Sequence, residues 1–279
     1  MRKFGRQLLA LTALAATFAA AQTAAAGTIY VVSNRDSNGE IYAYDDMAEL
    51  MAQTPSMITG DLVATRGAYF NDQGVTMDFS TGIVYRVNNN GGVLSYPTLA
   101  DWLANTNSTN VSIGTNPFSN TNLKRVNDAS YDGGTGGYYA VGSVLANSST
   151  PGDVLIYNTL NDFRAAASNT VLTAGYQLAR AMFWNSEGVA GTTINNENIV
   201  ANYFQISNAG RLEGFATLAA YAAEPNNRIN MGMEGAFAGT NTTGFNVVMA
   251  FAVPDPVPEP ASLVLCMGAV VGLFVVRRR

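Results

Sequence analysis

The sequence predicts an all-β fold made of four repeats, arranged as a propeller-like ring in which a short helix ends each blade. The first observation is a segment that opens with glycine and ends five residues later on an aromatic residue. It occurs four times, at residues 39–44, 91–96, 152–157 and 210–215. The final aromatics lie 52, 61 and 58 residues apart, at Tyr44, Tyr96, Tyr157 and Phe215. Repeat periods near 50 residues are typical of propeller blades.

The second observation is a strand-like stretch before each of these segments. These stretches are rich in β-branched and aromatic residues and are bounded by asparagine and glycine, which is the pattern of a strand. The four expected strands span residues 29–33, 83–88, 138–143 and 199–206. Turn-forming residues at 88–92 and 207–210 predict hairpins at those two connections.

The third observation is a short capped helix pattern after each aromatic. Helices are expected at residues 47–52, 99–104, 160–165 and 218–223, each with one apolar face. Each is preceded by a residue whose side-chain oxygen can accept an orphan backbone N–H: Asp46, Thr98, Thr159 and Thr217. Three residues after these caps stand Glu49, Asp101, Asp162 and Ala220. The glutamate fits the capping box, the aspartates fit it more loosely, and the alanine breaks it.

The order of the half-repeats predicts how the ring closes. An upstream half with additional strand-like segments is expected for repeats two, three and four, for example at residues 68–70 with 75–79 and at 178–184, whereas the first repeat lacks it. An unmatched copy stands near the C-terminus instead, in residues 230–237 and 245–253. We therefore expect the last strands to complete the sheet that the first strands begin, which hides strand edges. An open solenoid or a sandwich is the alternative.

The N-terminal residues have the order of a secretory signal peptide, residues 1–26. Three basic residues precede a short apolar run at residues 8–20, and small residues including Ala24 and Ala26 follow. We expect signal peptidase to cut after Ala26, with Ala21 as the second choice. A retained membrane anchor is the alternative, but the run is short for a span and its exit is rich in alanine.

Residues 255–279 form a distinct C-terminal tail. Pro258, Glu259 and Pro260 open it, an apolar run follows at residues 261–276, and three arginines end the chain: Arg277, Arg278 and Arg279. As a transmembrane helix the run would reach about 24 Å, somewhat less than a bilayer core. The positive-inside rule places the arginines in the cytoplasm.

This tail resembles the PEP-CTERM sorting signal of Gram-negative bacteria that produce exopolysaccharide. The resemblance rests on Pro258, Glu259 and Pro260, the apolar run and the terminal arginines, and it covers only about the last two dozen residues. It implies an exosortase, a membrane transpeptidase, as a processing partner that cuts near the Pro-Glu-Pro motif. It implies nothing about the activity of the domain. A permanent single-pass anchor is the alternative.

Composition excludes several classes of function for the domain at residues 27–254. This region holds nine basic and eighteen acidic side chains, a net charge of −9, so it should repel nucleic acid. The chain has no histidine, and its one cysteine, Cys266, lies in the tail. The domain therefore has neither the commonest general base nor a thiol nucleophile or disulfide.

A few residues are weak candidates for a ligand site. Asp78, Asp128 and Glu234 stand in roughly corresponding upstream strands, so they could face one axis and hold calcium, bind a sugar or act as a carboxylate pair. The alternative, which we favour, is that they are turn and edge residues. Four arginines recur at similar positions, and we expect structural pairing rather than an anion site: Arg66, Arg125, Arg180 and Arg228. Trp102 and Trp184 are expected to pack in the core rather than stack on sugars.

The sequence therefore predicts an exported cell-surface or matrix protein with a non-enzymatic binding domain. No catalytic residue, metal ligand or cofactor is assigned. Exopolysaccharide or another surface protein is the expected binding partner. The competing hypothesis is an extracellular carbohydrate-active hydrolase or lyase with a central carboxylate or calcium site.

Overall fold

The computed structural model describes the greater part of the chain between residues 27 and 253. The described ranges are 27–35, 38–66, 74–78, 81–88, 90–118, 123–128, 144–148, 154–167, 170–172, 181–190, 200–223, 228–239 and 241–253. The chain divides into two units, of which one is Gly27–Val253 and the other combines Met1–Ala26 with Pro254–Arg279. All described residues belong to the first unit, which is mostly β-sheet with a few short helices.

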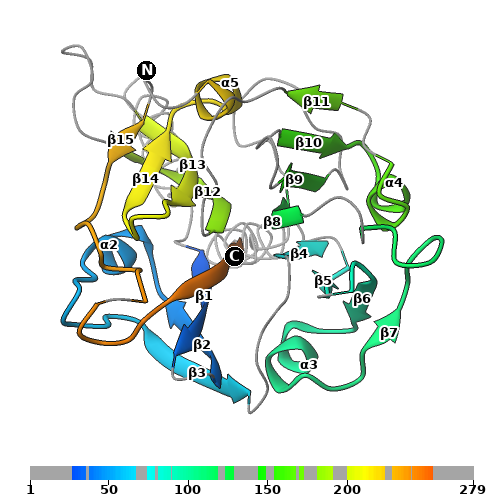
Figure 1. The fold of residues 1–279 in the computed structure, drawn as a ribbon, viewed down its shortest axis with the longest axis horizontal. Coiled ribbons are helices and arrows are strands. Elements are labelled where there is room, and N and C mark those ends of the chain that lie inside the picture. The colour runs from blue at the N-terminus through cyan, green and yellow to red at the C-terminus, as the bar shows by residue number, and fades with distance from the viewer. Residues whose placement is uncertain are drawn as a thin grey trace, which may run out of the picture. The chain divides into compact units, whose positions relative to one another are not determined.

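The strands of this unit form four antiparallel sheets of four strands each (Figure 1). In sheet order, the first contains β16 (Val247–Val253), β1 (Thr28–Arg35), β2 (Asn38–Tyr44) and β3 (Asp61–Arg66). The second contains β4 (Gly74–Asp78), β5 (Ile83–Val87), β6 (Val93–Tyr96) and β7 (Thr109–Asn110). The third contains β8 (Leu123–Asp128), β9 (Val144–Ser148), β10 (Val154–Tyr157) and β11 (Thr170–Leu172). The fourth contains β12 (Ala181–Ala190), β13 (Val200–Ile206), β14 (Leu212–Phe215) and β15 (Ile229–Asn230).

The first and last described strands pair with each other. β16 lies antiparallel to β1 from Thr28 opposite Val253 to Ser33 opposite Val247, as the orange and blue strands in Figure 1 show. The expectation that the C-terminal strand completes the N-terminal sheet is confirmed. β16 and β4, β4 and β8, β8 and β12, and β12 and β16 are in contact, so the four inner strands meet one another in sequence. We call β4, β8, β12 and β16 the inner strands.

The four expected helices are present, and each begins at its expected cap. They are α2 (Met47–Met51), α3 (Leu99–Ala104), α4 (Leu160–Arg164) and α5 (Leu218–Ala222). In each, the side chain of the residue before the helix accepts the backbone N–H three residues on, which satisfies one orphan donor. In α3 and α4 the cap hydroxyl also donates to the aspartate carboxylate, at 2.6 Å in the pair Thr98–Asp101 and at 2.7 Å in the pair Thr159–Asp162.

The aromatic residue that ends each glycine segment is fully buried in all four repeats. Two of these aromatics donate a hydrogen bond to an amide nine residues later: Tyr44 to the Oε1 of Gln53, and Tyr96 to the Oδ1 of Asn105 at 2.9 Å. Gln53 is itself buried and donates to the carbonyl of Ala236 at 3.1 Å, next to the last strand of the fold. The two amides therefore connect the segments that end α2 and α3 to the strands before these helices.

Some expected strands lie partly or wholly outside the described residues. The residues expected as a strand at 138–143 lie outside the described residues, and the strand that pairs with β10 is β9 (Val144–Ser148). The expected segments at 68–70 and 178–180 also lie outside the described residues.

Candidate functional site

The residues expected to direct export lie outside the described part of the chain. These are Ala24 and Ala26 at the signal cleavage site and the tail residues Pro258, Glu259, Pro260, Arg277, Arg278 and Arg279. The expected transmembrane helix at residues 261–276 is also outside it. Among the residues that the structure describes, no helix is long and apolar enough to cross a membrane.

Two of the three weak ligand candidates occupy equivalent positions. Asp78 is the last residue of β4, and Asp128 is the last residue of β8. These two inner strands are in contact with each other. The Oδ2 of Asp78 accepts a hydrogen bond from the Thr81 hydroxyl at 2.7 Å, and the Asp78 carbonyl accepts from the N–H of Gly82 at 2.7 Å. Asp78 therefore organises the turn between β4 and β5, as the turn-residue interpretation expects.

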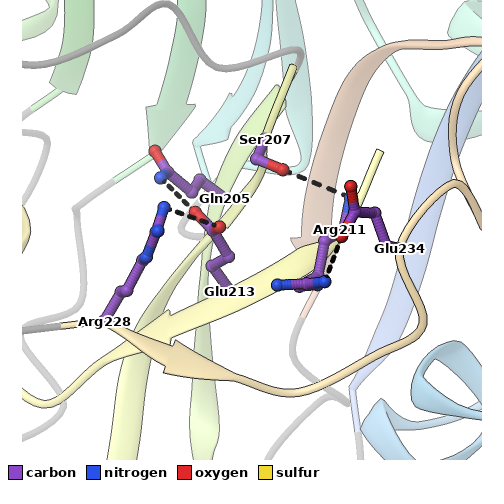
Figure 2. A network of polar contacts seen from close by, with 6 residues as sticks. All are labelled: Gln205, Ser207, Arg211, Glu213, Arg228 and Glu234. Carbon is purple, nitrogen blue, oxygen red and sulfur yellow. Dashed lines mark hydrogen bonds and ion pairs between the residues drawn. The ribbon is translucent and has the colours of Figure 1, made fainter. Parts of the chain in front are cut away.

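Glu234 does not occupy a corresponding strand, which corrects the third candidate. It lies in a turn between β15 and β16, where its side chain is 65% exposed and forms an ion pair with Arg211 (Figure 2). The strand expected at residues 230–237 is limited to Ile229–Asn230 because Gly232 and Gly235 follow, the latter with a φ of +79°. Asp78, Asp128 and Glu234 thus do not share one strand position.

A buried polar network lies on the fourth sheet and was not predicted. Glu213 on β14 is 2% exposed, and its Oε2 accepts a hydrogen bond at 2.7 Å from the Nε2 of Gln205, its register partner on β13. Its Oε1 forms an ion pair with the Nη1 of Arg228 at 3.3 Å (Figure 2). A carboxylate taken out of water needs such partners. Within the described part of the chain, the Oε1 of Gln205 is buried and has no hydrogen-bond partner.

The network holds three neighbouring segments of one sheet together. Gln205 comes from β13, Glu213 from β14, and Arg228 from the residue just before β15. The carboxylate is neutralised by the guanidinium and held by the amide, so its chemical role is to fix the strands. Sequence reasoning recognised Arg228 as a recurrent cation but missed its partner, because nothing local marks Glu213 as buried. A register argument would have placed Gln205 opposite Glu213 across the 207–211 turn.

The arginines that can be described have packing roles, as expected. The guanidinium of Arg66 lies 5.1 Å from the centroid of the Trp102 ring, and its Nε donates to the carbonyl of Leu103 at 3.3 Å. Arg228 forms the ion pair with Glu213. Arg180 lies outside the described residues, and for Arg125 only the backbone in β8 is described.

Trp102 belongs to the core, which confirms its expected role. It is fully buried, and its ring meets Phe251 edge-on at 5.2 Å and Tyr30 at 6.4 Å. These contacts join the second sheet to the first. Trp184 lies in β12 opposite Tyr203, and its side chain is outside the description. No group of three or more potential metal ligands occurs among the residues with described side chains.

Comparison with known proteins does not assign a family. No family model matches the chain, and no curated protein matches it. Two chains from COPII coats on membranes each show 13% identity and a TM-score of 0.29 over 71% of this chain. This chain spans only 57% and 32% of those two chains. A chain from the nidogen–laminin complex shows 7% identity and a TM-score of 0.32, over 80% of this chain and 98% of that one. Similarities this low leave the function to be argued from the chain's own residues.

Proposed function

We propose that this chain is an exported bacterial surface or matrix protein whose β domain binds a polymer or a partner protein without catalysing a reaction. The observation that carries the proposal is the pairing of Thr28 with Val253, which joins the first and last described strands in one sheet directly before the tail begins. The signal-like start and the Pro-Glu-Pro tail support export through the inner membrane, processing by signal peptidase and an exosortase, and delivery to the cell surface.

The domain itself is proposed to be a four-bladed β-propeller. Four antiparallel sheets, inner strands that contact one another in sequence, and a first sheet built from both ends of the domain support this architecture. Propellers use such closure to leave only short, protected edges. Their repeated turns and helices provide a broad scaffold for binding, which suits a surface protein.

The export proposal is tested by altering the tail in cells of the source bacterium. Deleting residues 257–279 should move the protein from the surface fraction into the medium. The matched variant Pro258→Ala/Glu259→Gln/Pro260→Ala keeps the apolar run and the arginines, so it should accumulate uncut in the membrane. Unchanged surface retention after the deletion would refute a role of the tail in sorting. An uncut wild-type tail would support the permanent anchor instead.

The binding proposal is tested on a glycan array with the purified protein, with and without calcium. One observation favours the competing hydrolase or lyase: Asp78 and Asp128 end two inner strands that touch. Bound glycans should therefore also be examined for chain shortening by mass spectrometry. Binding without shortening supports the scaffold. Shortening that is lost in Asp78→Asn/Asp128→Asn would establish the enzyme in its place.

A further inference from the structure

The methionines of the described domain differ widely in exposure. Met47 on α2 and Met249 on β16 are 2% and 1% exposed, whereas Met57 and Met233 are 51% and 54% exposed. Three others are partly buried and pack against the core clusters: Met51, Met77 and Met231. Met57 and Met233 are therefore the most exposed of the methionines whose side chains the structure describes.

A shielded and an accessible sulfur occur within one short segment after β15. The Sδ of Met231 lies 2.5 Å from the position that a Cβ on Gly214 would take, so this sulfur packs directly on the bare backbone of β14. The N–H of Met231 donates to the carbonyl of Leu212 at 3.0 Å, which holds it there. Met233 follows two residues later and is more than half exposed. The two thioethers have the same chemistry but different access from solution.

The backbone at Met57 is fixed without help from its side chain. The N–H of Met57 donates to the carbonyl of Thr54 at 3.2 Å, and the carbonyl of Met57 accepts from the N–H of Thr54 at 3.1 Å. Inside this turn the carbonyl of Pro55 accepts from the hydroxyl of Thr242 at 2.7 Å. A polar atom added to the Met57 side chain leaves these bonds in place, because none of them involves it.

The turn that contains Met233 is also held by other groups. The carbonyl of Met233 accepts from the N–H of Ala236 at 3.3 Å. The next residue, Glu234, forms the ion pair with Arg211. The exposed side chain of Met233 takes part in neither contact, so its oxidation state does not affect them.

We propose that Met57 and Met233 are the sites at which hydroperoxides modify this domain, and that both become sulfoxides without loss of the fold. A lone pair of the thioether sulfur attacks the hydroxyl oxygen of the hydroperoxide, so an S–O bond forms as the O–O bond breaks. The hydroxyl proton passes to the leaving oxygen. Sulfur is oxidised by two electrons, and the hydroperoxide is reduced to an alcohol, or to water if it is hydrogen peroxide.

Exposure also determines the stereochemistry of the products. An exposed sulfur is open to attack from either face, so Met57 and Met233 should each give both sulfoxide epimers. Each epimer is reduced by its own class of methionine sulfoxide reductase, so the modification is reversible only when both classes act. The surface of the domain thus consumes two equivalents of hydroperoxide before the core methionines react.

Peptide mass mapping of the full-length protein tests the proposal after timed exposure to hydrogen peroxide. The two exposed methionines should be oxidised at least about tenfold faster than Met47 and Met249, because buried sulfurs react only after local opening. Met233 should also be oxidised several-fold faster than Met231, its matched control. Each methionine is measured separately, so those outside the described residues do not enter the comparison. Equal rates at Met231 and Met233, or earlier oxidation of Met47, would overturn the assignment.

Thermal melting tests whether the fold survives. Protein oxidised at Met57 and Met233 alone should melt within about 2–4 °C of the untreated protein, and treatment with both reductase classes should remove both sulfoxides. The variant Met57→Leu/Met233→Leu keeps the side-chain volume, so it should melt like the wild type and lose the two rapidly oxidised sites. A larger fall in the melting temperature of the oxidised protein would overturn the claim that the fold tolerates the modification. Complete repair by one reductase class would overturn the claim of two-sided access.

Discussion

The second and third repeats have the same backbone conformation after their helices, but different residues adopt it. α3 and α4 both end with a residue in the left-handed region, Asn105 with a φ of +53° and Ala166 with a φ of +52°. In both, the next N–H returns to a carbonyl near the start of the helix at 2.9 Å. Asparagine tolerates this conformation, but alanine does so only at a cost of about 1–2 kcal/mol.

The residues at these two positions also determine whether a buried tyrosine hydroxyl has a hydrogen-bond acceptor. Tyr96 donates to Asn105 at 2.9 Å, whereas the hydroxyl of Tyr157 is buried and has no hydrogen-bond partner among the described residues. Ala166, nine residues after Tyr157, has no side-chain acceptor to offer. Burial raises the pKa of Tyr157 well above its usual value. In the second repeat Asn105 therefore has two roles: it tolerates the left-handed conformation and it accepts the hydrogen bond of the tyrosine. In the third repeat Ala166 is strained in that conformation and offers no acceptor.

The largest effect is expected from making the second repeat resemble the third. Asn105→Ala should lower the free energy of unfolding by about 2–3 kcal/mol, because a buried hydroxyl loses its acceptor and alanine is strained in the left-handed region. Urea denaturation followed by circular dichroism measures this. Asn90→Ala, in an exposed turn, is the matched control and should change stability little. Equal losses in both variants would contradict the comparison.

The reverse change should repair the third repeat. Ala166→Asn should raise the free energy of unfolding by about 1–2 kcal/mol by relieving strain and accepting the Tyr157 hydroxyl. Ala166→Gly relieves only the strain and should give about 1 kcal/mol. In a Tyr157→Phe background the advantage of asparagine over glycine should vanish, which a double-mutant cycle measures. A persistent advantage would show that the hydroxyl is not its cause.

Removing each hydroxyl should have different consequences in the two repeats. Tyr96→Phe should cost about 1 kcal/mol because it deletes a hydrogen bond. Tyr157→Phe should be neutral or slightly stabilising, since no described residue bonds to the hydroxyl that it removes. The two variants differ by one oxygen in matched positions, so thermal melts in parallel compare them directly. A larger loss at Tyr157 would mean that its hydroxyl is satisfied.

A smaller effect is expected from extending the comparison to the fourth repeat. Ala220 stands where α3 and α4 have Asp101 and Asp162, and the cap hydroxyl of Thr217 therefore has no carboxylate beside it at that position. Ala220→Asp should stabilise by about 0.3–1 kcal/mol, because a negative charge near a helix N-terminus is favourable. Ala220→Asn has similar shape without the charge and should give less. An identical gain from both would exclude the electrostatic explanation.

The smallest effect concerns the pH dependence of α3. Hydrogen bonds from Thr98 and Asn107 hold the pKa of Asp101 below its usual value. A carboxyl whose pKa is lower in the folded state stabilises the protein above its unfolded pKa, and this contribution is lost as the pH falls through the folded pKa. An NMR titration of Asp101 should therefore have a midpoint below about 3.9. Thr98→Ala should move that midpoint upward, and an unmoved midpoint would contradict the assigned cause.

The local features of the fold were predictable from the sequence. The long-range contacts were predictable only where the internal repeat indicated which segments pair. Caps such as Thr98 and Thr159 follow from chemistry within one helical turn. The pairing of β1 with β16 followed from a half-repeat missing at one end and present at the other. The burial of Glu213 did not follow, because it depends on which segment packs over β14. Glu234 was misplaced because a short strand and a turn share a similar composition.

The amides that accept the hydrogen bonds of Tyr44 and Tyr96 were also missed, although the sequence contains a pattern that indicates them. Gln53 and Asn105 both stand nine residues after their tyrosine, a spacing that aligned repeats display. The spacing was not used because the third repeat has alanine at that position and the fourth has Phe215 in place of the tyrosine, which needs no acceptor. The covariation between a tyrosine hydroxyl and its amide partner becomes visible only when both positions are compared across all four repeats.

The pairing of β1 with β16 also dictates an order of events during synthesis. β1 is the first and β16 the last of the described strands to be synthesised, so their contacts have the highest sequence separation among those strands. Such non-local contacts form slowly because a long loop must be closed first. The first sheet therefore stays without its inner strand until the whole domain has been made. If the chain is exported before its synthesis ends, the domain has not yet folded, because β16 is still missing from the first sheet.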